Sequence, residues 1–377
     1  EQARAIKIDG QVNATQELGL TAGANQWDYA SRSVTGSTTA SGSAPAYAID
    51  SSALGGMYAG RIRILATEAG VGVRMLGDAA ATADDFTLNA AGQVVVGSKV
   101  SAKRDLAANS SSNAANALTL NNASLTAQRD ISVTAAQGGA QITGGALVAG
   151  QNLGLNAKTL SDSSSTASDA DNNKRYAGGT ASLTVAQTAN LDGTAWGAGS
   201  ALHATTGSLT VGSAGAQMYS NGAMGLTATT GDLALNTAAV SAKNDVNLTA
   251  NAGAIQTTTG ANQGVQSTAG NIALNATAGV SNAGVIDAKA GNVTVRANGT
   301  VSNSGSLHAK GNLDVADRSN AASNNFSNTG TVLAEGTANI KATTFSNTSN
   351  LQGSQATTIA ANTLTNSGLL VASNSST

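Results

Sequence analysis

The sequence has no cysteine, a single proline and only 3% aromatic residues among its 377 positions. Without cysteine, a disulfide framework and a thiolate metal site are both excluded. Charged residues make up 11% of the chain, which is less than half the usual share of about 25%. An ordinary core of Phe, Trp and Leu is therefore excluded, and a thin core of Val, Leu, Ile and Ala remains possible.

Long apolar runs and basic runs are also missing. No stretch approaches the roughly 18 apolar residues that a membrane-spanning helix needs, so we expect no membrane insertion. The formal net charge is −2, so we expect no nucleic-acid partner. The chain begins at Glu1 without a basic and apolar leader. We expect it to be a processed or excised piece, with any export signal outside it.

What the sequence does contain is a recurring phrase. It reads apolar residue, any residue, Ala, a few polar residues, Asn or Asp, then another apolar residue. A period in the twenties without helical spacing is typical of stacked β coils. The phrase recurs, in some copies with one residue added, over 100–106, 125–131, 147–153, 240–246, 265–272, 286–293 and 307–313.

The segment that follows each phrase alternates between apolar and polar residues. In the segment 292–297, Val293, Val295 and Ala297 fall on one face, and Thr294 and Arg296 fall on the other. No sustained run has apolar residues at the i, i+3, i+4 and i+7 spacing of a helix. The predicted fold class is therefore all-β, a parallel β-helix or solenoid with about 20 residues per coil.

A second phrase, apolar-Ser/Thr-Asn followed by two small residues, marks the later coils. Its Asn and Gly residues suit sharp turns. Stacked coils bring equivalent residues to within about 4.8 Å, so the pattern predicts an amide ladder and a stacked aromatic pair. The predicted ladder contains Asn282, Asn303, Asn328, Asn347 and Asn366, and the predicted pair is Phe326 with Phe345.

At about 20 residues each, we expect 16 to 18 coils in a rod on the order of 80 Å long. Insertions in such a fold leave at the corners without disturbing the stack. Three polar stretches read as insertions, namely 31–46, 161–179 and 317–325. The second is the most charged, so we expect it to be a distinct surface feature.

The opening segment resembles a known family. Residues 48–62 run into 64–73 and resemble the junction that follows the secretion domain of filamentous haemagglutinin proteins, and residues 6–29 resemble the end of that domain. From Val94 onward, only the period and composition of haemagglutinin repeats are similar. We therefore predict a division into residues 1–90, the end of the secretion domain and its junction, and residues 91–377, the repeats with their polar insertion.

This family of two-partner secretion exoproteins includes adhesins and the surface sticks of contact-dependent growth inhibition systems. The resemblance implies a right-handed β-helix, secreted or displayed on the surface of a Gram-negative bacterium. It also implies an outer-membrane transporter as partner. The Asn-Pro-Asn-Gly and Asn-Xaa-Asn-Gly signatures of the secretion domain do not occur. We therefore expect most of the transporter-recognition part to be missing here.

No residues are predicted to act as catalytic, cofactor-binding or metal-binding groups. His203 and His308 are both read as exposed second residues of the recurring phrase. They lie about five coils apart and could not converge on a metal ion. The acidic residues Asp162, Asp169 and Asp171 could offer oxygens to Ca²⁺, but a polar loop is the favoured interpretation.

Four residues are candidates for contact with a partner such as a target-cell receptor. Lys174, Arg175 and Tyr176 close the second insertion, and Trp196, read together with Tyr219, follows it. Near the start of the chain, we expect Arg61 and Arg63 to share a face. A surface ion pair with Glu68 is the simplest interpretation of that charge group.

The function that these features favour is structural. The chain is predicted to be the β-helical shaft of an exported protein that acts in adhesion or presents a growth-inhibiting toxin. One alternative is that this stretch itself binds the receptor. Another is a β-helical enzyme that degrades polysaccharide, which would need carboxylates or basic residues clustered in a groove. The thin and scattered charges argue against the enzyme.

Overall fold

The structure is a computed structural model, and it describes residues 2–31, 33–164, 173–213, 215–258 and 264–372. Over these residues, every regular element is a β-strand and no helix is present. Parallel pairing winds the chain into a β-solenoid of about 16 turns with about 22 residues per turn. The all-β parallel β-helix is confirmed, with coils slightly longer than predicted. The chain divides into two compact units, residues 1–186 and 187–377.

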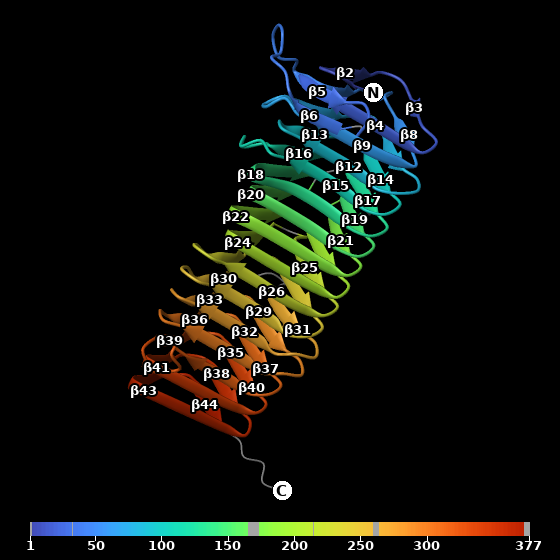
Figure 1. The fold of residues 1–377 in the computed structure, drawn as a ribbon. Helices are drawn as coiled ribbons and strands as arrows, with labels where there is room; N and C mark the ends of the chain where they lie inside the picture. Colours follow the sequence, from blue (N-terminus) through green and yellow to red (C-terminus); the bar gives the residue numbers. More distant parts are fainter. Residues whose placement is uncertain (1, 32, 165–172, 214, 259–263, 373–377) are drawn as a thin grey trace. The chain divides into compact units, whose positions relative to one another are not determined.

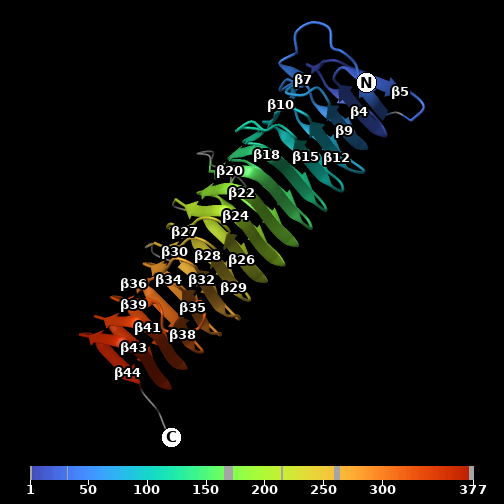
Figure 2. The ribbon, with the colours of Figure 1, turned by 60° about the vertical axis from the view of Figure 1, so that its left-hand side comes forward.

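Each coil contributes strand segments to three columns, and in some coils one long strand supplies two of them. In one coil of the second unit, β28 (Ala239–Ala242) belongs to the third column, β29 (Val246–Ala250) to the first and β30 (Ile255–Thr257) to the second. Each strand pairs in parallel with its equivalent one coil on, as Val246 does with Ile272 and Val240 with Val265. Figure 1 and Figure 2 show this repeat from two sides.

In the first unit, the first and second columns are built from separate short strands up to Asn121, and from long shared strands after it. The first column contains β1 (Gln2–Ala3), β4 (Glu17–Ala22), β9 (Arg61–Ala66), β12 (Phe86–Ala90) and β15 (Leu106–Ser110). The second contains β2 (Ile6–Ile8), β7 (Tyr47–Ser51), β10 (Gly72–Met75), β13 (Val94–Val96) and β16 (Leu118–Asn121). The long strands β18 (Ile131–Thr143) and β20 (Leu153–Ser163) serve both columns.

The third column of the first unit has one short strand per coil. It contains β3 (Val12–Asn13), β8 (Met57–Ala59), β11 (Ala79–Ala81), β14 (Lys99–Ala102), β17 (Ser124–Ala127), β19 (Ala146–Ala149) and β21 (Lys174–Ala177). The strand β22 (Thr180–Asp192) contains the point of division between the units.

The second unit repeats the same plan. Its first column contains β26 (Ala223–Ala228), β29, β32 (Ile272–Ala276), β35 (Val293–Ala297) and β38 (Leu313–Ala316), and its second contains β27 (Leu233–Leu235), β30, β33 (Val280–Asn282), β36 (Val301–Asn303) and β39 (Asn325–Asn328). Strands β24 (Ala201–Gly212), β41 (Thr337–Asn347) and β43 (Ala356–Asn366) serve both columns. The third contains β23 (Ala195–Ala198), β25 (Gln217–Ser220), β28, β31 (Gly264–Ser267), β34 (Val285–Ala288), β37 (Ser306–Ala309), β40 (Thr331–Ala334), β42 (Asn350–Gly353) and β44 (Leu369–Ala372).

The recurring phrase marks one corner of the coil. Its first half forms a third-column strand, and its final apolar residue begins a first-column strand, as in β28 and β29. Within a strand, every second side chain points inward, so Val246 and Leu248 are buried and Asn247 is exposed. Each inward position stacks on the same position of the next coil. The core is thus a set of aliphatic columns, which is how a chain poor in aromatic residues fills it.

The predicted insertions fare differently. Of the stretch 31–46, the described residues 33–46 do leave the coil, as part of a longer excursion that includes the antiparallel hairpin of β5 (Asn25–Asp28) and β6 (Ser33–Ser37). Residues 317–324 form a loop between β38 and β39. The prediction for 161–179 is wrong at both ends, because its first residues complete β20 and residues 174–177 form β21. Within the described ranges, no helix is long and apolar enough to cross a lipid bilayer.

Candidate functional site

A ladder of asparagine side chains lies inside the second column. Asn282 Nδ2 donates to Asn303 Oδ1 over 2.7 Å, Asn303 to Asn328 over 2.8 Å, Asn328 to Asn347 over 2.7 Å and Asn347 to Asn366 over 2.8 Å. The first four residues of the ladder are buried and Asn366 is exposed. Each buried amide also donates to a backbone carbonyl at 2.9–3.1 Å, so both of its donor hydrogens are used. The sequence pattern therefore marks a structural hydrogen-bond network.

The two phenylalanines of the later coils stack inside the same column. Phe326 and Phe345 occupy equivalent positions of β39 and β41. Their ring centroids are 5.6 Å apart and their planes differ by 14°. Both rings are buried. They supply much of the core volume in the last coils and are not available to a partner.

A buried ion pair occupies the core where the second insertion was expected. Asp162 takes the inward position held by Ile142 one coil earlier, and Arg175 takes that of Leu147. Both side chains are 0% exposed, and Arg175 Nη2 lies 2.7 Å from Asp162 Oδ1. The second bond of this bidentate pair, Arg175 Nε to Asp162 Oδ2, is 3.2 Å long.

The backbone completes the coordination of Arg175. Its Nη1 and Nη2 atoms donate to the carbonyl oxygens of Gly145 at 2.8 Å and Gly144 at 3.0 Å. The two glycines have φ of 64° and 61°, a conformation that glycine adopts readily. A tight turn thereby aims two carbonyls at one guanidinium. Because the charge is paired and hydrogen-bonded, it can be buried where a leucine would otherwise stand.

This geometry corrects the prediction of a contact surface. Arg175 is 0% exposed and Trp196 is 1% exposed, so neither can touch a partner. Trp196 lies in the inward row of the third column, in register with Met218 of the next coil. Lys174 lies over the ring of Tyr176, 5.3 Å from its centroid, and both are partly exposed, as is Tyr219. Asp162 is a core residue, and Asp169 and Asp171 lie outside the described residues.

The two histidines also need correction. His203 is exposed, but it lies on β24 of the first column and not on the recurring phrase. His308 lies on β37 of the third column and is half-buried, with its Nδ1 atom 2.6 Å from Asp287 Oδ1. Its Nε2 atom lies 3.5 Å from Glu335 Oε1. Lys310 also pairs with Glu335 and lowers the pKa of that carboxyl, so His308 belongs to an ionic column between coils.

The charges near the start of the chain pair differently from the prediction. Glu68 pairs with Arg4, with Arg4 Nη2 2.8 Å from Glu68 Oε1, and this hydrogen bond lowers the pKa of Glu68. Arg61 pairs with Asp84, one coil further on. The reason is that register, and not closeness in sequence, decides which outward side chains meet. Among the described residues, Arg63 has no ion-pair partner and no side-chain hydrogen bond.

The loop between β38 and β39 is held by Asp317. Its Oδ1 atom accepts hydrogen bonds from Ser319 N at 2.9 Å, Ser319 Oγ at 2.8 Å and Ala321 N at 2.7 Å. The Ser323 hydroxyl and the Ala321 amide are the main groups that lower the pKa of Asp317 from 3.8 to about 2. The carboxylate therefore organises this loop as long as it is ionised.

We expect the stabilising effect of Asp317 to depend on pH. Because its folded pKa is depressed, its contribution is complete above the unfolded pKa of 3.8 and is lost as the pH falls toward about 2. Urea unfolding at these two pH values should show a larger loss of stability for the wild type than for Asp317→Asn. Equal losses in the two proteins would mean that the carboxylate does not hold the loop.

No centre for redox or hydrolytic metal chemistry stands out. Among the residues that the structure describes, no group of three or more His, Asp or Glu side chains is placed to hold a metal ion. The groups found instead are ladders and columns in which each side chain meets its equivalent one coil away. Such an arrangement stabilises a stack, and it leaves the outward faces of the strands as the surfaces available to partners.

Comparison with known proteins identifies the first part of the chain. The profile of the TPS secretion domain, the domain of two-partner secretion, matches residues 1–96. Toxin CdiA of Yersinia pestis is 39% identical over 110 residues, which are 29% of this chain and 3% of that protein. Residues 1–96 thus match the secretion domain of two-partner secretion exoproteins. The resemblance read from residues 6–73 is thereby confirmed, and the matched stretch extends further in both directions.

Two more relatives show how far the similarity of this chain to known proteins extends. The tRNA nuclease CdiA-2 of Burkholderia pseudomallei is 47% identical over 94 residues, 25% of this chain and 3% of the relative. Toxin CdiA of Escherichia coli is 33% identical over 184 residues, 45% of this chain and 6% of the relative. The aligned segments thus span only 3–6% of the curated relatives. No solved structure matches the chain.

Proposed function

We propose that this exoprotein segment is part of the shaft of a toxin-presenting stick of the contact-dependent growth inhibition type. The observation that carries the proposal is the in-register stacking of coils within each unit, as between Ile286 and Leu307. Such a stack can be extended coil by coil and holds its two ends apart. The toxin names of its relatives favour presentation of a toxin over adhesion as the main role.

We further propose that the protein passes through an outer-membrane transporter of the two-partner type and acts at the surface of a Gram-negative bacterium. The match of residues 1–96 to a secretion domain supports this. The division at residue 90 stays a prediction, and it falls within a few residues of the end of that match. The nuclease names belong to proteins of which the aligned segment is a small part, so no catalytic activity is assigned to this chain.

Removal of whole coils should be tolerated if the chain acts as a shaft. Ile286 and Leu307 stand in register 21 positions apart. Deleting residues 286–306 therefore joins strands that still match, and Asn282 then meets Asn328. In the full-length parent, we expect this deletion to retain export and growth inhibition of target cells, measured by immunoblot of surface protein and by co-culture.

A half-coil deletion is the matched control. Deleting residues 286–296 removes a shorter segment but shifts every following inward side chain out of its column. We expect this variant to lose folding and surface display. If the whole-coil deletion exports normally yet fails to inhibit, the segment carries a specific contact and not only a length. The partly exposed Lys174 and Tyr176 would then be the first residues to replace.

A further inference from the structure

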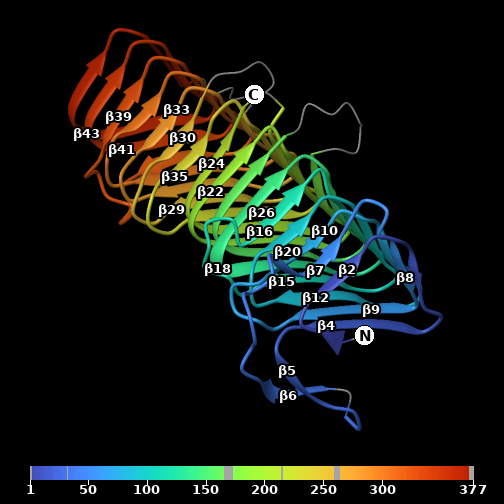
Figure 3. The ribbon, with the colours of Figure 1, turned by 90° about the horizontal axis from the view of Figure 1, so that it is seen from above.

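The hairpin of β5 and β6 stands away from the stacked coils of the first unit, beside β4 (Figure 3). The chain leaves the coil for the hairpin at Gly23, where φ is 135°. A side chain would not fit at this position, because its Cβ would lie 2.2 Å from Thr67 Oγ1. Thr67 Oγ1 donates to Asn25 Oδ1 at 2.5 Å and fixes the base of the hairpin to the coil. The hairpin is therefore anchored to the coil and does not hang free.

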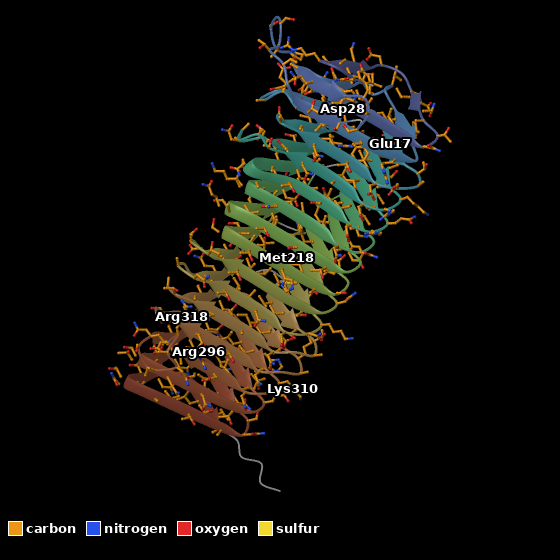
Figure 4. All side chains as sticks on the ribbon, viewed as in Figure 1. Glu17, Asp28, Met218, Arg296, Lys310 and Arg318 are labelled. Carbon is orange, nitrogen blue, oxygen red and sulfur yellow. The ribbon has the colours of Figure 1, made fainter. Side chains whose placement is uncertain are left out.

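Hydrogen bonds also link the described residues near the tip of the hairpin. Asp28 accepts hydrogen bonds from Ala30 N and Ser31 Oγ, both at 2.8 Å, and Ser31 Oγ lies 2.8 Å from Ser33 Oγ. The bond from Ser31 is the main cause that lowers the pKa of Asp28. Figure 4 places Asp28 and Glu17 at the same end of the unit. A hollow between this hairpin and the outward face of β4 and β9 is thus largely preformed.

The hollow has a volume of about 540 Å³, within the usual size range of small-molecule sites. Its floor includes Gly19, Arg63 and Leu65, with Trp27 on the hairpin side and Glu17 at the start of β4. No atom of the described residues lies within 4 Å of where a Cβ of Gly19 would stand, so the missing side chain helps to keep the space open. The site combines an indole ring with charged and polar groups.

Arg63 is the feature that points to a ligand. Among the arginines that the structure describes, it alone makes no ion pair or side-chain hydrogen bond, while the neighbouring Arg61 is paired with Asp84. Its position opposite Gly19 in the register of β4 and β9 directs it to the hollow. A guanidinium with five unused donors matches a carboxylate in bidentate geometry.

We propose that this hollow binds a hexuronic acid unit of a saccharide. The carboxylate of the sugar would pair with Arg63, and the apolar face of the pyranose ring would lie on the indole of Trp27. Glu17 and the side-chain oxygens nearby would accept hydrogen bonds from the ring hydroxyls, while Glu17 disfavours ligands of higher negative charge. A neutral sugar lacks the first contact, and a simple carboxylic acid lacks the other two.

The test uses the whole chain with methyl β-D-glucuronide as probe. Trp27 is partly exposed while Trp196, the other tryptophan, is 1% exposed, so a saturable change in tryptophan emission reports on Trp27. We expect a dissociation constant on the order of 1 mM for a ligand of this size. Methyl β-D-glucoside and N-acetylglutamate should each bind about tenfold more weakly or not at all.

Three variants locate the binding. Gly19→Leu fills the hollow, and we expect it to abolish binding with unchanged folding, because Gly19 does not have a positive φ. Arg63→Gln should weaken glucuronide binding about tenfold and leave that of the glucoside unaltered. Gly154→Leu is the matched control, since Gly154 also lies outward on a first-column strand of the same unit with space around it. It should bind as the wild type does.

Several results would overturn the proposal. Equal affinities for the glucuronide and the glucoside would show that Arg63 does not bind the carboxylate of the sugar. Equal binding of N-acetylglutamate would show a site for carboxylates in general, as an acidic peptide would present. Binding that survives Gly19→Leu, or that Gly154→Leu removes as well, would place the sugar elsewhere. No change in emission together with no saturation-transfer signal from the sugar would exclude the site altogether.

Discussion

Replacing Asp162 with asparagine is expected to lower the free energy of unfolding of the first unit by about 3–5 kcal/mol. The change keeps the shape of the side chain but leaves the guanidinium of Arg175 buried, 0% exposed and without its countercharge. Removing one partner of a buried ion pair is costly because the remaining charge has lost its water as well as its partner. Urea unfolding of the chain, followed by circular dichroism, measures the difference.

Two further variants test the reason for this loss. Asp162→Leu combined with Arg175→Met restores the apolar character that Ile142 and Leu147 give the preceding coil, and we expect it to recover most of the stability. Asp9→Asn breaks the exposed pair with Lys7 and should lower the free energy of unfolding far less, because water solvates both charges and screens the pair. A cost for Asp162→Asn as small as that of Asp9→Asn would contradict the buried pair.

Replacing Asn328 with alanine is the second large expected effect, a loss of about 2–4 kcal/mol in the second unit. Asn328 accepts from Asn303 and donates to Asn347 and to the carbonyl of Asn350. Its removal leaves the side-chain oxygen of Asn347 and that carbonyl without their donors inside the core. Each buried polar group without a partner costs roughly 1–3 kcal/mol.

The end of the same ladder supplies the control. Asn366 is exposed, so water can replace its bonds and Asn366→Ala should cost less than about 1 kcal/mol. The double variant Asn303→Ala with Asn328→Ala should lose less than the sum of the single losses, because the two residues share one bond. Strictly additive losses would show that the amides act independently and not as a network.

The fold was predictable because its signals repeat. The phrase that forms β28 recurs at the same corner of several coils, and the alternation in β35 shows directly which side chains point inward. The same repetition predicted the partners of Asn303 and Phe326, since equivalent positions of adjacent coils must meet. Where each coil repeats the last, a local pattern is enough to place long-range contacts.

The sites depend on residues that interrupt the repeat, and these were harder to interpret. The cluster Lys174, Arg175 and Tyr176 looks like a polar loop, although Arg175 holds an inward position and pairs with Asp162. Only the strand register reveals that pairing. The partner of Glu68 was missed for a similar reason, because Arg4 is distant in sequence. The paired glycines 144 and 145 were the one available sign that carbonyls turn inward there.

The asparagine ladder also has a direction. Thr257 Oγ1 donates to Asn282 Oδ1 at 2.5 Å, and every later amide donates toward the C-terminal side. The dipoles of these groups therefore point in the same direction along the column, and each hydrogen bond polarises the next one. A coil that folds next to one of these amides on its C-terminal side meets an Nδ2 donor that is already oriented toward it. The ladder is therefore polar, so its Thr257 end and its Asn366 end present different groups to a further coil.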